Sequence, residues 1–376
     1  MSRIKIETLT AVHIGSGEAL QYGTDFVTGK LEEEYVISIV DPRKVMDLIG
    51  EANVHHWVTA IERKEATSKV VKQFAPNAKL EDYSKRIIME WSAAKPSDTL
   101  KEQIHDGQGR PYIPGSSIKG AIRTAVLASL TDNIHRIEDK IDASKKNRDG
   151  IVFKPLASAK KVEAEVFGAN PNEDLFRFLQ VGDAYFGGLR EVAVRMVNIN
   201  ERERSGFWDE SKSQLIEAIS PEEHTEFLLK LNLDGYKFAK EKVHLLPDCM
   251  GSIPELFNTI NNHTRHLLEE EVDYWEERKD NDASDKVSAY LETIDSILTR
   301  VNECKEEKEC VLRIGHGSGW RFITGAWAER LNNFDSLVIP VSRPSNFKYE
   351  KYDFPKTRRV DDQCELLGFV KLTLLE

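Results

Sequence analysis

Apolar and polar residues alternate at both ends of the chain, and this period of two predicts β-strands. Near the N-terminal end, residues 3–14 place an alternating set on one side: Ile4, Ile6, Thr8, Thr10, Val12 and Ile14. Residues 368–374 alternate in the same way at the other end. Shorter apolar runs predict further strands at 35–40, 179–186, 191–199, 225–233 and 310–314.

A period between three and four residues marks the predicted helices. After the turn Pro114-Gly115, apolar residues recur at helical spacing and form one face: Ile118, Ile122, Ala125 and Val126. Ser116 and Ser117 precede this face and are typical N-cap residues, so we expect a helix to begin there. Further helical patterns cover residues 43–95, 131–175, 254–278, 284–303 and 323–331.

Each half of the chain contains the same motif, a predicted strand that ends in a glycine-rich loop. The polar segment 201–206 lies between them and is the best linker in the sequence. We therefore expect a mixed α and β fold with two domains, residues 1–205 and residues 206–376, and with helical insertions.

Charge limits how the protein can contact nucleic acid. The chain has 52 Lys and Arg against 63 Asp and Glu, a formal net charge of −11. This excess argues against a protein that coats nucleic acid over its whole surface, but it permits a local basic groove. The acidic runs 269–277 and 303–309 are typical of solvated helix faces, or of a surface that meets a basic partner.

No feature of the sequence points to a membrane or a metal. No apolar run reaches the length that spans a bilayer and no signal peptide is recognisable, so we expect a cytoplasmic protein without a membrane partner. The four cysteines form no CxxC pair, and we expect reduced thiols, no metal site and no cofactor: Cys249, Cys304, Cys310 and Cys364.

The helix that follows Pro114-Gly115 begins with cations, Lys119 and Arg123, which share one face. A cation near a helix N-terminus opposes the helix dipole, at a cost of roughly 0.3–1 kcal/mol. An anion on the free N–H groups of the first turn reverses that penalty, so the segment predicts a phosphate site. The alternative is a helix start with two exposed cations, and carboxylates of the same chain that neutralise both side chains would contradict the phosphate site.

Three glycine-rich segments could bring backbone N–H groups close to a polyanion: 15–17, 115–120 and 315–319. None matches a nucleotide-binding motif. Gly115 and Gly120 have the spacing of a P-loop, but Ala121 and Ile122 replace the required Lys and Ser or Thr. In the third segment, Trp320 occupies the position of the last dinucleotide-binding glycine.

Other candidate RNA-binding residues surround the third segment and precede the last strand: Gly317, Ser318, Trp320, Lys356, Arg358 and Arg359. Trp320 could stack on a base for roughly 1–3 kcal/mol. It could equally be a core residue beneath the loop, which is the interpretation that we favour.

These motifs together resemble the RAMP superfamily of CRISPR proteins. The segments that carry the resemblance are His13-Ile-Gly-Ser-Gly17, Tyr112-Ile-Pro-Gly-Ser-Ser-Ile-Lys-Gly-Ala-Ile-Arg123 and Gly315-His-Gly-Ser-Gly-Trp320. The later segments 355–360 and 367–371 extend it. Within the superfamily the chain is similar to the subunits that cap the 3′ end of the CRISPR RNA (crRNA) in type III-A Csm complexes.

The resemblance implies an α+β fold of two tandem ferredoxin-like (RRM-like) domains with helical insertions. It implies an RNA-binding structural subunit that binds the 3′ portion of the crRNA, caps the backbone filament and takes part in crRNA maturation and antiviral defence. Its implied partners are crRNA, the neighbouring RAMP backbone subunit, target RNA and small helical subunits. It places guide-phosphate contacts at Gly15, Ser16, Gly17, Ser116, Ser117, Lys119 and Arg123.

Two other functions stay open at the level of sequence. The backbone subunit of the related complexes cuts target RNA with an aspartate after its first strand, and Asp25 is the matching position. A metal-dependent endoribonuclease would use Asp25 to bind a divalent cation or to orient a 2′-hydroxyl; the alternative is a turn aspartate after Gly23. A protein-only scaffold with acidic docking helices is the third hypothesis.

Overall fold

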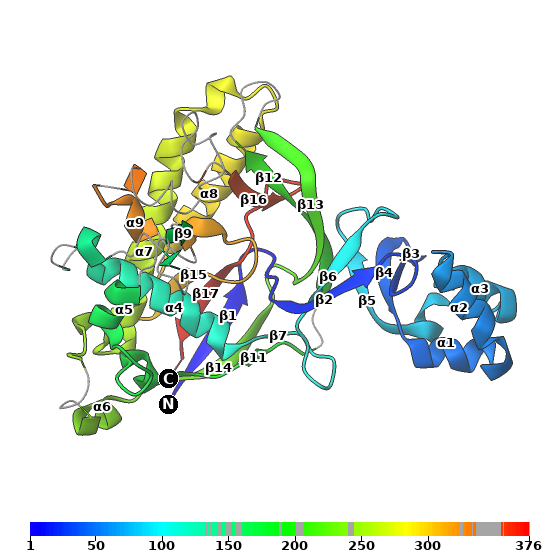
Figure 1. The fold of residues 1–376 in the computed structure, drawn as a ribbon, viewed down its shortest axis with the longest axis horizontal. Coiled ribbons are helices and arrows are strands. Elements are labelled where there is room, and N and C mark those ends of the chain that lie inside the picture. The colour runs from blue at the N-terminus through cyan, green and yellow to red at the C-terminus, as the bar shows by residue number, and fades with distance from the viewer. Residues whose placement is uncertain are drawn as a thin grey trace.

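The computed structural model describes residues 1–131, 134, 137–140, 145–146, 152–154, 160–187, 190–200, 207–239, 244–322, 326–332, 334–335, 355 and 357–375. The fold is mixed α and β, as predicted, with helices packed against two large sheets (Figure 1). Among the described residues, no helix is both long enough and apolar enough to cross a membrane.

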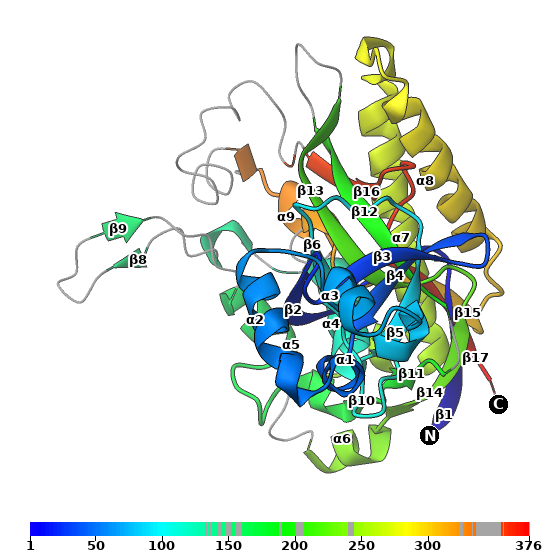
Figure 2. The same cartoon turned by 90° about the vertical axis from the view of Figure 1, so that its right-hand side faces the viewer.

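The first sheet joins strands from both ends of the chain. Its order is β10-β14-β1-β17-β15, and its strands are Leu179–Val181, His224–Leu231, Ser2–Thr8, Phe369–Leu374 and Glu309–Arg313. β1 pairs antiparallel with β14 on one side and with β17 on the other. Both chain ends therefore lie at the same corner of this sheet (Figures 1 and 2).

The second sheet is strongly curled. Its order is β2-β6-β13-β12-β5-β4-β3, and β16 also pairs with β12. These strands are Gly15–Gln21, Thr99–Gln103, Trp208–Ile219, Glu191–Asn200, Ser84–Glu90, Glu34–Val40, Phe26–Leu31 and, for β16, Thr357–Asp361. Only the turn 22–25 separates the two edge strands β2 and β3, so the sheet closes around a core of its own that includes Phe26, Ile88 and Leu215.

Helices cover the first sheet and extend from the second. α4 (Gly115–Leu130) and the start of α7 (Ile253–Glu276) pack on the five-stranded sheet. α8 (Lys286–Asn302) runs back along α7 as an antiparallel hairpin (Figure 2). The insertion between β4 and β5 holds α1 (Pro42–Ile49), α2 (Val54–Glu62) and α3 (Thr67–Phe74). The remaining elements are short: α5 (Lys160–Phe167), α6 (Leu233–Ala239), α9 (Ala326–Glu329), β7 (Tyr112–Ile113), β8 (Lys145–Lys146), β9 (Val152–Lys154) and β11 (Ala184–Tyr185).

Sequence periodicity located most of the packed elements correctly. The apolar face predicted for α4 is fully buried against the first sheet, at Ile118, Ile122, Ala125 and Val126. The first helix of the stretch predicted at 43–95 begins at Pro42, where the Asp41 carboxylate accepts hydrogen bonds from the first-turn N–H groups of Arg43 and Lys44. Each buried isoleucine of α4 contributes about 1.5–3 kcal/mol through its removal from water.

The structure corrects the predicted extents of several elements. The strand expected at 3–14 ends at Thr8, and the stretch expected to be helical up to residue 95 contains β5 instead. The division at 205/206 does not separate two sheets. It falls between β12 and β13, which pair with each other, and β1 pairs with β14 and β17 from the other half. The linker 201–206 itself lies outside the described residues.

Candidate nucleic-acid interface

The fold brings the first and third glycine segments into direct contact. The backbone N–H of His316 donates a hydrogen bond of 2.9 Å to the carbonyl of His13, and the two imidazole rings meet edge to face at 5.7 Å. Gly315 allows this approach, because its φ is +80° and an added Cβ would lie 2.5 Å from the His13 carbonyl oxygen. We call the contact between residues 13–17 and 315–319 the loop junction.

The two loops of the junction differ in exposure. Residues 15–17 are exposed at the start of β2, and an added Cβ at Gly17, where φ is +97°, would meet no atom within 4 Å. By contrast, Gly317 and Ser318 are buried, and the Ser318 hydroxyl donates to the Gly315 carbonyl at 2.7 Å. The expected RNA contacts of Gly317 and Ser318 are therefore corrected to structural roles within the loop, whereas Gly15, Ser16 and Gly17 stay accessible.

Two cations flank the loop junction without a carboxylate partner among the described residues, Lys101 on β6 and Arg359 on β16. Arg359 donates from Nη1 to Nε2 of His316 over 3.2 Å. Burial and the charges of Arg359 and Lys101 lower the pKa of His316. Burial also lowers the pKa of His13, to about 4, and the charges of His316 and Lys101 act in the same direction. At neutral pH the site therefore combines two neutral imidazoles with two full positive charges.

Sequence analysis missed Lys101. Its place beside the junction depends on β6, which pairs with β2 on one side and β13 on the other. That pairing is non-local, and no local pattern around Lys101 distinguishes it from other surface lysines.

The helix of the second glycine segment begins differently from the prediction. α4 starts at Gly115 with Pro114 as its N-cap, and neither Ser116 nor Ser117 makes a capping hydrogen bond. The N–H of Gly115 donates to the Asp183 carboxylate at 2.7 Å. A carboxylate of the same chain thus lies at the N-terminus of the helix. It occupies the first N–H group of the predicted phosphate site, and the prediction is corrected to a contact within the chain.

Lys119 and Arg123, which sequence analysis treated alike, have different surroundings. The Arg123 guanidinium donates two hydrogen bonds of 3.0 Å to Asp174 and covers the ring of Phe167 at 4.0 Å. Arg123 is neutralised within the chain, so its predicted phosphate contact is corrected to an ion pair. Lys119 has no ion pair within the described part of the chain, and burial lowers its pKa although Asp174 acts against this.

Gln103 links the segment before α4 to the first loop. Its side-chain oxygen accepts from the N–H of Ile14 at 2.8 Å, and its amide nitrogen donates to the carbonyl of Tyr112 at 3.3 Å. Gln103 is fully buried, so these hydrogen bonds hold the first loop and the segment before α4 in a fixed position relative to each other. The loop junction and the strand that leads into α4 are therefore parts of one connected surface.

The remaining predicted residues divide into buried, exposed and undescribed ones. Trp320 is partly buried, packs against the main core and meets the Phe334 ring at 5.8 Å, as the core interpretation predicts. Arg358 is buried and donates through Nε to Glu271 at 2.6 Å, so this part of its guanidinium is engaged within the chain. Lys356 lies outside the described residues.

Asp25 occupies a turn between β2 and β3. Its carboxylate accepts from the backbone N–H of Gln21 at 2.8 Å, and its own N–H donates back to the Gln21 carbonyl at 2.9 Å. This reciprocal pairing is what a turn aspartate provides. The structure therefore shows Asp25 as a turn aspartate, the alternative interpretation of this position.

One group of side chains within the described residues has the spacing of metal ligands: Glu102, His105 and Glu217. Arg86 lies between the two carboxylates and donates to Glu217 at 2.6 and 2.7 Å and to Glu102 at 3.1 Å. His105 bonds instead to Glu191 at 2.8 Å. A guanidinium thus takes the place that a cation would need, and the group functions as a buried ion-pair network.

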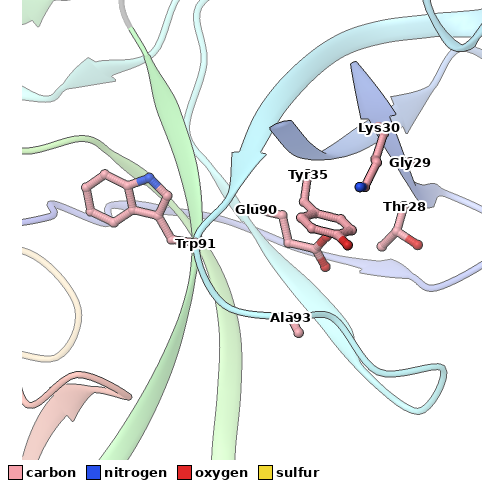
Figure 3. Close-up of a pocket in the computed structure, with 7 residues that line it drawn as sticks. All are labelled: Thr28, Gly29, Lys30, Tyr35, Glu90, Trp91 and Ala93. Carbon is pink, nitrogen blue, oxygen red and sulfur yellow. The ribbon is translucent and has the colours of Figure 1, made fainter. Parts of the chain in front are cut away.

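A pocket of about 540 Å³ opens on the second sheet and is lined by residues of β3, β4 and the end of β5 (Figure 3). The Lys30 ammonium lies over the Tyr35 ring at 4.4 Å, whereas Trp91 projects to the opposite side of the chain from Tyr35 (Figure 3). The neighbouring hairpin turn, 32–33, and the first residue of β4 are three exposed glutamates. Their charge repels phosphates, so this pocket does not extend the candidate RNA interface.

The comparisons with known proteins agree with this fold. The sequence pattern described as RAMP superfamily matches residues 5–322. A relative from Methanocaldococcus jannaschii, described as CRISPR system Cms protein Csm5, is 22% identical over 99% of this chain and 89% of its own length.

Two solved structures share the architecture. A chain in a cryo-EM structure of a type III-A Csm-crRNA-target RNA ternary complex superposes with a TM-score of 0.71, at 20% identity and over 100% of both chains. The crystal structure of T. onnurineus Csm5 gives a TM-score of 0.63 at 20% identity, over 97% of this chain and 99% of that one. Since the superfamily match covers most of the sequence, the chain belongs to the RAMP superfamily.

Proposed function

We propose that the protein is a non-catalytic RNA-binding subunit of a type III-A CRISPR ribonucleoprotein complex in the cytoplasm. In this role it binds the 3′ portion of the crRNA, caps the filament of RAMP backbone subunits and takes part in crRNA maturation and antiviral defence. Its partners are the crRNA, the neighbouring backbone subunit, target RNA and small helical subunits. Membership of the RAMP superfamily and the similarity to Csm5 and to a Csm complex support this proposal.

The observation that carries the proposal is the cationic loop junction. Lys101 and Arg359 have no carboxylate partner among the described residues, and the exposed backbone of Gly15, Ser16 and Gly17 lies beside them. Lys119 on α4 adds a third cation of this kind. An acidic protein that keeps cations unpaired at one place has a site for a polyanion there, while its other surfaces meet protein.

The proposed architecture is a pair of tandem ferredoxin-like units that share their sheets. In support, each half of the chain contributes one helix, α4 or α7, to the five-stranded sheet. The unit boundary at 205/206 then marks the connection between β12 and β13 rather than a gap between separate bodies.

Single-stranded RNA binding tests the interface directly. Each lost phosphate contact flattens the dependence of log affinity on log salt by about 0.7, so the double variant Lys101→Ala/Arg359→Ala should flatten it by about 1.4. Arg3→Ala/Lys5→Ala is the matched control: it removes the same charge, but both side chains already pair with glutamates, Glu226 and Glu7. Equal salt slopes for the two double variants would reject the interface.

The competing functions need separate experiments. Labelled target RNA with Mg²⁺ tests for an endoribonuclease, and we expect intact RNA with both the unmodified protein and Asp25→Asn. Cleavage that disappears in Asp25→Asn would establish the enzyme instead. A protein-only scaffold predicts assemblies with backbone subunits that survive ribonuclease, whereas we expect the capping contact to weaken when the RNA is digested.

A further inference from the structure

Two arginines donate to one buried glutamate behind the third glycine segment, and a third arginine lines the same cavity. Arg358 donates to Glu271 at 2.6 Å from β16, and Arg321 donates to the other carboxylate oxygen at 2.6 Å. Arg313, at the end of β15, lines the same cavity. We call Arg313, Arg321, Arg358 and Glu271 the arginine pocket; Ser318, Gly319 and Arg359 also line it.

The charges of the arginine pocket do not balance. Although burial raises the pKa of Glu271, the charges of Arg358 and Arg321 lower it to about 2, so this glutamate is fully ionised. Glu329 pairs with Arg321 at 3.2 Å, but burial raises its pKa to about 7 and leaves it only partly ionised at neutral pH. Within the described part of the chain, three guanidinium groups therefore face fewer than two negative charges.

Arg313 is the least compensated of the three. It is 6% exposed, and among the described residues its acceptors are backbone carbonyls alone, at Leu367 over 2.9 Å and at Gly317 over 3.4 Å. The rings of Phe322 and Phe369 lie on either side of it at 4.6 and 4.9 Å from the guanidinium carbon. A buried cation without an anionic partner is unfavourable, so a negative group in the pocket would be strongly stabilised.

One hydrogen-bond donor of the pocket has no acceptor. The side chain of Arg358 is only 9% exposed, and its Nη2 atom is buried without a hydrogen-bond partner among the described residues. Buried donors in folded proteins are nearly always paired with protein, water or a ligand. The cavity that Arg358 helps to line measures about 20 Å³, which accommodates one water-sized atom such as a single phosphate oxygen.

The pocket is open toward Gly319. An added Cβ at Gly319 would meet nothing within 4 Å, whereas the same test at Gly317 finds Leu367 at 3.1 Å. Gly315, Gly317 and Gly319 all have positive φ, between 78° and 93°, and alternating conformations of this kind turn backbone N–H groups toward an anion. An approaching group thus meets backbone donors first and the arginines behind them.

We propose that the arginine pocket binds a phosphate group, one oxygen of which enters the cavity and accepts a hydrogen bond from Nη2 of Arg358. The rest of the phosphate lies at the mouth, between Gly319 and Arg359. The source is a terminal phosphate of the bound RNA, a backbone phosphate or free inorganic phosphate; the RNA sources rest on the proposed function, and the free ion does not.

Binding of inorganic phosphate to the full chain is the first test. Potassium phosphate should raise the melting temperature more than potassium chloride at equal ionic strength, and calorimetric titration should show one site. Arg358→Lys keeps the charge opposite Glu271 but removes Nη2, and should weaken phosphate binding about 10- to 100-fold, the value of one charge-assisted hydrogen bond. Arg123→Lys is the matched control, because Arg123 also pairs with a carboxylate and covers aromatic rings.

If potassium phosphate raises the melting temperature no more than potassium chloride does, the cavity does not bind phosphate and the proposal is overturned. That comparison uses the unmodified protein and holds even if Arg358→Lys does not fold. Equal affinity of Arg358→Lys and Arg123→Lys for phosphate would overturn it as well.

Two RNAs of one sequence, ending in a 3′-phosphate or a 3′-hydroxyl, identify the source. Tighter binding of the 3′-phosphate RNA, lost in Arg358→Lys, assigns the pocket to the RNA end. Equal binding of both, weakened by inorganic phosphate in competition, assigns it to a backbone phosphate, and no competition assigns it to the free ion. If inorganic phosphate binds and neither RNA does, the proposed function fails while the pocket stands.

Discussion

Arg86 donates two hydrogen bonds, of 2.6 and 2.7 Å, to the carboxylate of Glu217, which is fully buried. The same carboxylate accepts the backbone N–H of Gln103, the residue that links the first loop to the strand before α4. The ion pair therefore supports the geometry of the loop junction from within the second sheet.

Removal of either partner of this pair should destabilise the protein. Arg86→Met leaves an uncompensated buried carboxylate, and we expect the free energy of unfolding to fall by about 3–5 kcal/mol in urea denaturation. Arg86→Met/Glu217→Leu should recover at least half of that loss, because an apolar pair of similar volume avoids the buried charge. A single variant that costs less than about 1 kcal/mol would show that the pair is solvated.

Gly315 and Gly319 form a matched pair for testing the loop junction. Both have φ near +80°, so an alanine at either position costs about 1 kcal/mol through backbone strain. Only at Gly315 does the new Cβ also meet the His13 carbonyl, at 2.5 Å. Gly315→Ala should therefore unfold at a lower urea concentration than Gly319→Ala. Equal stability of the two variants would show that the loops do not pack as closely as described.

Alanine substitutions at Lys119 and Arg123 should have opposite effects: one should change RNA affinity and the other should change stability. Arg123→Ala removes a partly exposed ion pair and an aromatic contact, and should lower the free energy of unfolding by about 1–2 kcal/mol without changing RNA affinity beyond twofold. Lys119→Ala should do the reverse, weakening RNA binding while stability changes by less than about 0.5 kcal/mol. Urea denaturation and fluorescence anisotropy on the same samples decide between them, and a shared pattern would contradict the distinction.

The sequence allowed prediction of what depends on neighbouring residues. Periodicity located the buried face of α4, the strands β1 and β17 at the two ends of the chain, and the helices α7 and α8, since each carries its own apolar pattern. β13 escaped prediction because its first half is polar and largely exposed, which removes the alternation. The pairing of Arg123 with Asp174, across a long sequence separation, has no local signal at all.

Glu271 illustrates the same limit within a single helix. The run 269–277 is acidic and was expected to face solvent, yet Glu271 is 2% exposed. It lies four residues from Leu267 and four from Trp275, both buried, so helical spacing alone places it on the apolar face. What spacing cannot supply is the reason for a glutamate there, because its arginine partners come from distant loops and strands.

The charge on Glu271 should make stability depend on pH in a predictable direction. Burial disfavours its ionised form, but Arg358 and Arg321 outweigh this and lower its pKa from 4.5 to about 2 in the folded protein. A depressed carboxyl pKa adds stability above the unfolded value of 4.5 and loses it as the pH falls toward 2. The full effect is about 3 kcal/mol, of which about 2 kcal/mol is lost by pH 3.

Glu271→Gln isolates this contribution from that of other carboxylates. Urea denaturation of both proteins at pH 5.5, 4 and 3 gives the difference in the free energy of unfolding, and we expect that difference to shrink by about 2 kcal/mol over this range. Asp106→Asn is a suitable control, because the Asp106 carboxylate is outside the core and its pKa is lowered mainly by the N–H of Arg110. A difference that stays constant down to pH 3 would mean that the pKa of Glu271 is not lowered in the folded protein, and that Arg358 and Arg321 do not stabilise its charge.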